Sequence, residues 1–213
     1  PALGIEVSAT QMRKLWTMLA HVNGGLWNAS QLAASLGVSY HTVDRYVDIL
    51  ERAFLVRKVA PYFANVGKRL VKSPKVYFRD TGLLHHFLGI RSSEQLETHP
   101  ARGASWEAFV VDQLLSGFRR VDPACQGWFW RTAQGDEVDL LIETGSRLVP
   151  FEAKLHSSPG PDEARGVRRC MADLGLSRGY VVYPGRERYS LGHGVAVLPA
   201  ASLLARPPSL LRL

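Results

Sequence analysis

The fold of the second half of the chain is decided by two short stretches, GDEVDLLI at residues 135–142 and FEAK at residues 151–154. Both are apolar enough to predict β-strands, and the Gly-containing segment between them predicts a turn. Successive side chains of a strand point to opposite faces, so Glu152 and Lys154 share one face. If the two strands pair as a hairpin, Asp139 meets Glu152 and Lys154 at one end of the sheet.

Two carboxylates and an ammonium group at one point suit a divalent metal and an activated water. We expect Asp139 and Glu152, with the carbonyl of Ala153, to offer oxygen ligands to Mg²⁺ or Mn²⁺. Lys154 would position the water or offset developing charge. This chemistry is that of metal-dependent phosphodiester hydrolysis. The alternative is a solvated pair of strand ends in which Lys154 forms a plain salt bridge.

A third carboxylate is expected from a helix over residues 105–118. Glu107 lies on the same stripe as apolar residues three, four, seven and eleven positions further on, namely Val110, Val111, Leu114 and Phe118. A carboxylate on an apolar face is costly to bury unless it is paired or bound to a metal. Glu107 is therefore the third predicted catalytic and metal-binding residue. The alternative is a glutamate of the first helical turn that faces water.

The spacing of these residues resembles the PD-(D/E)xK nuclease superfamily, with twelve residues between Asp139 and Glu152-Ala153-Lys154 and with Val138 where the family has proline. The resemblance implies a restriction-endonuclease-like αβββαβ domain over residues 91–213, after a polar linker at residues 91–102. The chain as a whole is then of the α/β class (α+β overall). The expected elements are a helix at 105–118, strands at 127–131, 137–143 and 148–155, a helix at 162–174, a strand at 179–183 and an edge strand at 195–198.

The first ninety residues predict a winged helix-turn-helix domain. Helices are expected at residues 11–21, 28–36 and 40–53, and strands at 54–59 and 75–78. In such a module the last helix enters the major groove and the wing touches phosphate. The residues expected to contact nucleic acid are Tyr40, His41, Thr42 and Arg45 on that helix, and Lys68, Arg69, Lys72 and Lys75 in the wing. The helix carries a net charge of −1, which leaves a protein-docking role open.

Charge is spread unevenly over the 213 residues, whose formal net charge is +7. Residues 1–90 hold 11 Lys and Arg against 5 Asp and Glu, and the remainder holds 15 against 14. A basic first segment favours nucleic acid, DNA above all, as its partner. No apolar run reaches the roughly 20 residues of a membrane span, and two cysteines are too few for a disulfide framework. We therefore expect a cytoplasmic protein without membrane contact.

The segment at residues 61–84, together with WEAFV at 106–110 and the two strands, resembles the C-terminal half of prokaryotic AAA-type ATPases that carry a winged helix and a DUF4143 domain. The resemblance implies an ATPase domain of the same protein as a partner. The chain begins at Pro1 and contains no Gly-x-x-x-x-Gly-Lys-Ser/Thr loop, so we expect a fragment without ATPase activity. The alternative to a nuclease is an inactive regulatory module that binds nucleic acid or protein. Oligomerisation is left open.

Overall fold

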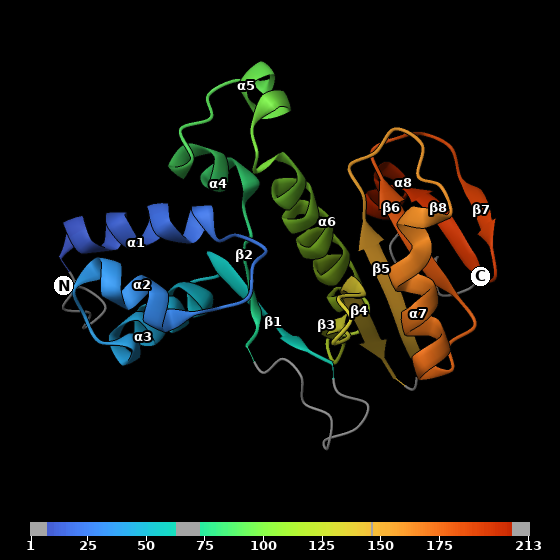
Figure 1. Cartoon of the computed structure of the whole chain (residues 1–213), viewed down its shortest axis with the longest axis horizontal. Coiled ribbons are helices and arrows are strands. Elements are labelled where there is room, and N and C mark those ends of the chain that lie inside the picture. Colours follow the sequence, from blue (N-terminus) through green and yellow to red (C-terminus); the bar gives the residue numbers. More distant parts are fainter. Residues whose placement is uncertain (1–7, 63–72, 146, 206–213) are drawn as a thin grey trace. The chain divides into compact units, whose positions relative to one another are not determined.

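The N-terminal helices begin where the sequence supplies a capping side chain. In the computed structural model, which describes residues 8–62, 73–145 and 147–205, the side chains of Ser8, Asn28 and Ser39 each accept a hydrogen bond from a backbone N–H three residues later. The second helix ends at Gly37, whose φ of 66° suits a residue without a Cβ. These helices are α1 (Ala9–His21), α2 (Ala29–Leu36) and α3 (Tyr40–Arg52) (Figure 1).

The apolar faces of these helices share one core with the elements that follow. Leu15 and Val47 are fully buried there, together with Phe78. Trp16 stacks on Phe87, with ring centroids 5.1 Å apart, and so ties α1 to a later helix. The elements that follow are β1 (Val56–Pro61), β2 (Lys75–Phe78), α4 (Thr81–Phe87) and α5 (Ser93–Thr98).

A buried asparagine fixes the loop between α1 and α2. The Asn23 side chain accepts a hydrogen bond from the N–H of Phe78 (2.9 Å) and donates one to the carbonyl of Ala104 (3.1 Å). The loop then forms an isolated antiparallel bridge between Leu26 and Lys75. The loop therefore lies against β2 as a short strand would.

The second half of the chain alternates helices and strands. Its elements are α6 (Arg102–Arg119), β3 (Gln126–Arg131), β4 (Glu137–Thr144), β5 (Arg147–Ala153), the 3₁₀ turn η2 (Asp162–Ala164), α7 (Arg165–Leu174), β6 (Gly179–Tyr183), β7 (Tyr189–Gly192), β8 (Val195–Pro199) and α8 (Ala200–Ala205). The described strands form one mixed sheet in the order β2-β1-β3-β4-β5-β6-β8-β7. Strands β3, β4 and β5 pair antiparallel, whereas β5, β6 and β8 run parallel.

Helices cover both faces of this sheet. On one face Phe118 of α6 packs on Phe151, which stacks on Tyr180 with centroids 5.3 Å apart. On the other face α7 buries Val167 and Met171 against two residues of β4 and against alternate residues of β6 and β8. The period-2 alternation of the strands thus assigns Phe151 to the α6 side and Glu152 to the α7 side.

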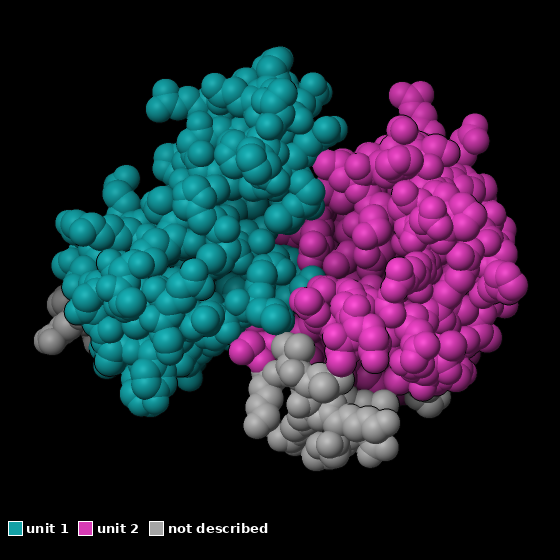
Figure 2. Space-filling view, in the orientation of Figure 1, with its two compact units in different colours: residues 1–58, 75–105 teal, residues 59–74, 106–213 magenta. Residues whose placement is uncertain are grey.

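The chain divides into two units, coloured separately in Figure 2. One comprises residues 1–58 and 75–105, and the other comprises residues 59–74 and 106–213. Strand β1 contributes to both, since its end pairs with β3 through Ala60 and Pro61. Neither unit is therefore continuous in sequence.

Most predicted elements are confirmed within one or two residues at each end, and the strand at 179–183 is confirmed at both ends. Two expectations need correction. The strand at 195–198 is not an edge strand, because β7 pairs outside it. The expected linker at 91–102 contains α5. Within the described ranges, no helix combines the length and hydrophobicity needed to cross a bilayer.

Both thiols are predicted to be inert in the folded protein. Cys125 and Cys170 are fully buried, and burial is the main cause that raises the pKa of Cys170 to about 12 and also raises the pKa of Cys125. At pH 8 only about one Cys170 in 10⁴ is then a thiolate. We expect iodoacetamide to label neither cysteine in buffer and both in guanidinium chloride, measured by intact mass. Rapid labelling of Cys170 in buffer would contradict its burial on the side of α7 that packs on the sheet.

Candidate functional site

The site begins where the β4–β5 ladder ends. The hairpin pairs its strands from Thr144–Arg147 to Leu140–Phe151. Beyond that pair the ladder does not continue, because the side chains of Asp139 and Glu152 take the place of backbone acceptors. Glu152 Oε2 accepts from the Asp139 N–H at 3.3 Å, and Asp139 Oδ2 accepts from the Ala153 N–H at 2.9 Å. Each carboxylate is therefore held by the strand that carries the other.

A bulge in β4 puts Asp139 in this position. Between the pairs Trp128–Leu141 and Trp130–Val138, β4 advances three residues while β3 advances two. The extra residue lets Val138 and Leu141 both pack under α7, and it bends β4 at Asp139. Asp139 and Glu152 are each only 7% exposed. The hairpin thus brings the two carboxylates together, as the sequence predicted, and the structure places both in a nearly buried position.

Lys154 joins the same cluster. Its ammonium lies 2.6 Å from Glu152 Oε1, and its backbone N–H donates to the carbonyl of Val182 in β6. Burial alone would lower the pKa of Lys154, but the charge and hydrogen bond of Glu152, followed by the charges of Asp139 and Glu107, outweigh burial and raise it. Lys154 is therefore a cation at neutral pH and not a proton acceptor.

Glu107, half-buried near the start of α6, faces the same cluster closely enough to act on the pKa of Lys154. It does not complete a three-ligand metal site. Among the described residues, no three His, Cys, Asp or Glu side chains lie close enough together to form one. The donor set that the structure brings together is Asp139 and Glu152 beside the main chain of Ala153. Hard oxygens of this kind fit Mg²⁺, which binds through one or two carboxylates and keeps several waters.

An open groove of about 710 Å³ leads to Glu152 and Lys154. It runs past the turn before β4 and the start of α7, where Arg165 pairs with Asp136 at 2.9 Å. Its charged lining comprises Asp136, Glu137, Glu152, Asp162 and Glu163 against Lys154 and Arg165. The groove is therefore acidic. Nothing in the sequence indicates that Asp136 and Arg165 belong to the site, because their ion pair joins residues 29 positions apart and leaves no local signal.

Helix α3 presents part of the predicted nucleic-acid surface. Tyr40, His41 and Arg45 are exposed, and the Tyr40 and His41 rings lie 3.9 Å apart. Thr42 is half-buried, and its N–H and hydroxyl both bond to the Ser39 cap.

The acidic residues of α3 are engaged by the protein itself. Asp44 accepts from the Trp27 indole at 2.6 Å, Asp48 pairs with Lys58, and Glu51 accepts from the Lys58 N–H. These contacts pair part of the negative charge of α3 within the protein. In the sequence analysis that charge is the argument against DNA contact by this helix.

The predicted wing contacts are only partly visible. Lys68, Arg69 and Lys72 lie outside the described residues. Lys75 is 5% exposed, and its ammonium lies 6.0 Å from the centroid of the Tyr77 ring. The structure thus places Lys75 inside β2, because alternation along this fully buried strand leaves no solvent-facing position. A phosphate contact by Lys75 does not agree with this burial.

Comparison with known families divides the chain between residues 94 and 102 and leaves residues 59–74 in the first part. Residues 1–94 match a family described as Domain of unknown function (DUF8612), and residues 102–203 match Domain of unknown function (DUF4143). The chain carries a DUF8612 and a DUF4143 domain. The DUF4143 domain contains all four predicted catalytic residues, Glu107, Asp139, Glu152 and Lys154.

Two curated relatives are uncharacterized proteins from Mycobacterium bovis and Mycobacterium tuberculosis. Each is 45% identical to the chain over 202 residues, which is 95% of the chain. The chain spans 44% of the length of either relative. No solved structure is significantly similar to it.

The docking of α7 beside Asp139 predicts a strict requirement for glycine at position 166. A Cβ on Gly166 would overlap the carbonyl oxygen of Glu137, which is backbone and cannot rotate away. We expect Gly166→Ala to destabilise the protein by about 1–3 kcal/mol or more, although alanine favours helices. The control is Gly103→Ala in α6, where a Cβ meets nothing within 4 Å. Urea titration should show that variant unchanged or up to about 1 kcal/mol more stable. Equal effects of the two would contradict the contact.

Lys154 predicts a dependence of stability on alkaline pH. Because its pKa is raised on folding, its ammonium stabilises the folded state fully below the ordinary value near 10.5. That contribution is lost as the pH rises through the folded pKa. We expect the stability difference between wild type and Lys154→Met, from urea titrations, to be constant from pH 7 to about 9.5 and to shrink above about 10.5. A difference that grows at high pH would contradict the raised pKa.

Proposed function

We propose that the DUF4143 domain is a metal-dependent phosphodiesterase that acts on DNA, with the helices of residues 9–52 as a winged-helix module that binds the same substrate. The element order α6-β3-β4-β5-α7-β6 supports this proposal, because it matches the αβββαβ core of restriction-endonuclease-like domains. The observation that carries it is the reciprocal anchoring of Asp139 and Glu152 beside Lys154. Buried carboxylates held by backbone N–H groups are pre-organised, as a catalytic site requires.

Each residue then has a distinct task. Asp139 and Glu152 would hold Mg²⁺ or Mn²⁺, and the metal, when bound, would polarise a phosphate and acidify a water. Lys154, a cation at neutral pH, would offset negative charge that develops on the phosphate. Glu107 adds the smallest of the carboxylate charges that raise the pKa of Lys154, after those of Glu152 and Asp139. The bonds between the two strands hold both carboxylates in place without a metal.

The proposal extends to an ATPase partner. The resemblance to AAA-type ATPases implies such a domain, and the 44% coverage of the curated relatives leaves room for it in them. The present chain lacks a phosphate-binding loop of that type. Any ATPase activity would belong to that other domain.

A second function is favoured by two observations. The groove to Lys154 is acidic, and the ammonium of Lys154 pairs directly with one of the two proposed metal ligands. These features fit a domain that keeps the nuclease-like fold as a regulatory module and binds a partner without cleaving it. The two functions differ in whether the site takes up a divalent cation.

A cleavage assay tests the first function. Plasmid, labelled duplex and labelled single-stranded DNA are incubated with the full chain and Mg²⁺ or Mn²⁺. We expect cleavage that requires metal and falls about 100-fold or more in Asp139→Asn and in Lys154→Ala. The matched control is Asp173→Asn, which removes a carboxylate from α7 where it pairs with Arg169.

Three results would decide against catalysis. Cleavage that is equal in all variants would exclude Asp139 and Lys154 from the reaction. An equal loss of cleavage in Asp173→Asn would mean that the loss comes from a change in net charge or in protein stability and not from the proposed site. The absence of cleavage, together with calorimetry that shows no Mn²⁺ uptake by the wild type, would favour the regulatory module.

A further inference from the structure

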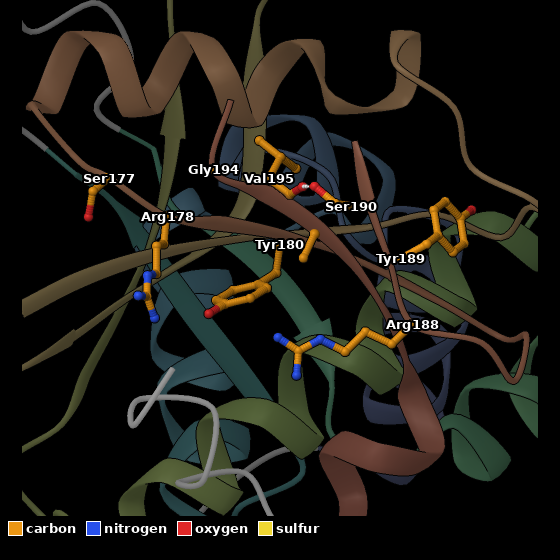
Figure 3. A pocket seen from close by; sticks show the side chains of 9 residues that line it. Ser177, Arg178, Tyr180, Arg188, Tyr189, Ser190, Gly194 and Val195 are labelled. Carbon is orange, nitrogen blue, oxygen red and sulfur yellow. Dashed lines mark hydrogen bonds between the residues drawn. The ribbon is translucent and has the colours of Figure 1, made fainter. Parts of the chain in front are cut away.

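A second pocket lies on the other face of the sheet, the α6 side, near its β7 edge (Figure 3). Its floor is formed by neighbouring residues of three strands, Tyr180 on β6, Ala196 on β8 and Ser190 on β7, which are register partners. Tyr180 is assigned to this face by its stack on Phe151, which itself packs on α6. The pocket has a volume of about 620 Å³ and is open to solvent.

Two arginines flank this floor. Arg178 immediately precedes β6 and Arg188 immediately precedes β7, and both line the pocket. Figure 3 shows the two guanidinium groups on opposite sides of the Tyr180 ring. Both arginines are exposed. No acidic residue is among the described residues that line the pocket, and none of the described hydrogen bonds or ion pairs involves either guanidinium group.

The floor adds neutral donors at fixed positions. Tyr180 is only 4% exposed and its ring stacks on Phe151 at 24°, so the ring cannot act as an open stacking platform. Figure 3 shows its hydroxyl end on the side of the Arg178 guanidinium group. The Ser177 hydroxyl lies at the pocket wall as well, whereas the Ser190 hydroxyl donates to the carbonyl of Val195 within the protein. Guanidinium forks with nearby hydroxyl donors match the oxygens of phosphate groups.

We propose that this pocket binds the phosphodiester backbone of a nucleic-acid strand through Arg178, Arg188 and the Tyr180 hydroxyl. The open, shallow form suits a polymer that passes across it. The absence of an exposed ring face argues for backbone contact rather than contact with bases. This step rests on the proposed function: because the groove at Lys154 is acidic, a DNA substrate would gain affinity from a basic surface elsewhere on the same domain. The pocket does not depend on metal or on cleavage.

The test measures oligonucleotide binding in EDTA, which removes divalent metal and so prevents metal-dependent cleavage. Fluorescence anisotropy with a labelled single-stranded oligonucleotide, over a range of salt concentrations, compares the full chain with Arg178→Ala, Arg188→Ala, the double variant and Tyr180→Phe. The control, Arg120→Ala, removes an exposed arginine just beyond α6. We expect affinity to fall about tenfold in the double variant. The slope of log affinity against log salt should decrease by about 0.7 for each arginine removed from the pocket.

Tyr180→Phe should weaken binding a few-fold and leave the salt slope unchanged, because it removes a neutral donor and keeps the ring stack. Thermal melting of every variant confirms that the fold is retained. Unchanged affinity in the double variant, or an equal loss in Arg120→Ala, would overturn the proposal. Displacement of the oligonucleotide by polyglutamate as effectively as by unlabelled DNA would overturn the phosphate assignment. A chain without cleavage that still shows the expected losses would support the pocket and reject only the nuclease.

Discussion

The structure of the second unit depends on two hydrogen bonds that join carboxylates to the backbone across β4 and β5. Asp139 and Glu152 stand where the strand ladder would otherwise leave two N–H groups without partners, one of them buried and the other partly buried. An orphaned buried donor costs about 1–3 kcal/mol, so each side chain is needed for folding as well as for any chemistry. The same arrangement closes the hairpin and defines the site. Fold and site are therefore one physical feature here.

Burial of two carboxylates then requires a positive charge beside them, and Lys154 supplies it. The acidic residues of α3 also have partners for their charge, but in a different setting. Asp44 and Asp48 lie at partly exposed positions and use contacts to Trp27 and Lys58, which commits their charge to the scaffold. Asp139 and Glu152 thus lie close together and are nearly buried, whereas Asp44 and Asp48 have separate partners and are partly exposed. That contrast is the physical reason to look for chemistry at Asp139 and not on α3.

Strong local signals explain what the sequence predicts correctly. The apolar strands β4, β5 and β6 and the capped helices follow from alternation and from Ser or Asn at helix starts. A hairpin brings Asp139 and Glu152 together whatever the remaining fold, so this part of the site needs no long-range information. What the sequence misses is non-local or weak. Strand β7 is half-exposed and rich in small residues, and the burial of Lys75 depends on a strand that is covered on both faces.

Strand β1 has a consequence for how the chain can be divided. Its last residues, Ala60 and Pro61, pair with β3, and they come from a segment more than forty residues before the DUF4143 match begins. A truncated chain that starts at residue 102 would keep every proposed catalytic residue and still lose this neighbour. The hydrogen-bonding groups of β3 would then be open to strands of other molecules, which is a common route to aggregation. Insolubility of such a piece would reflect a missing border strand and would say nothing against its chemistry.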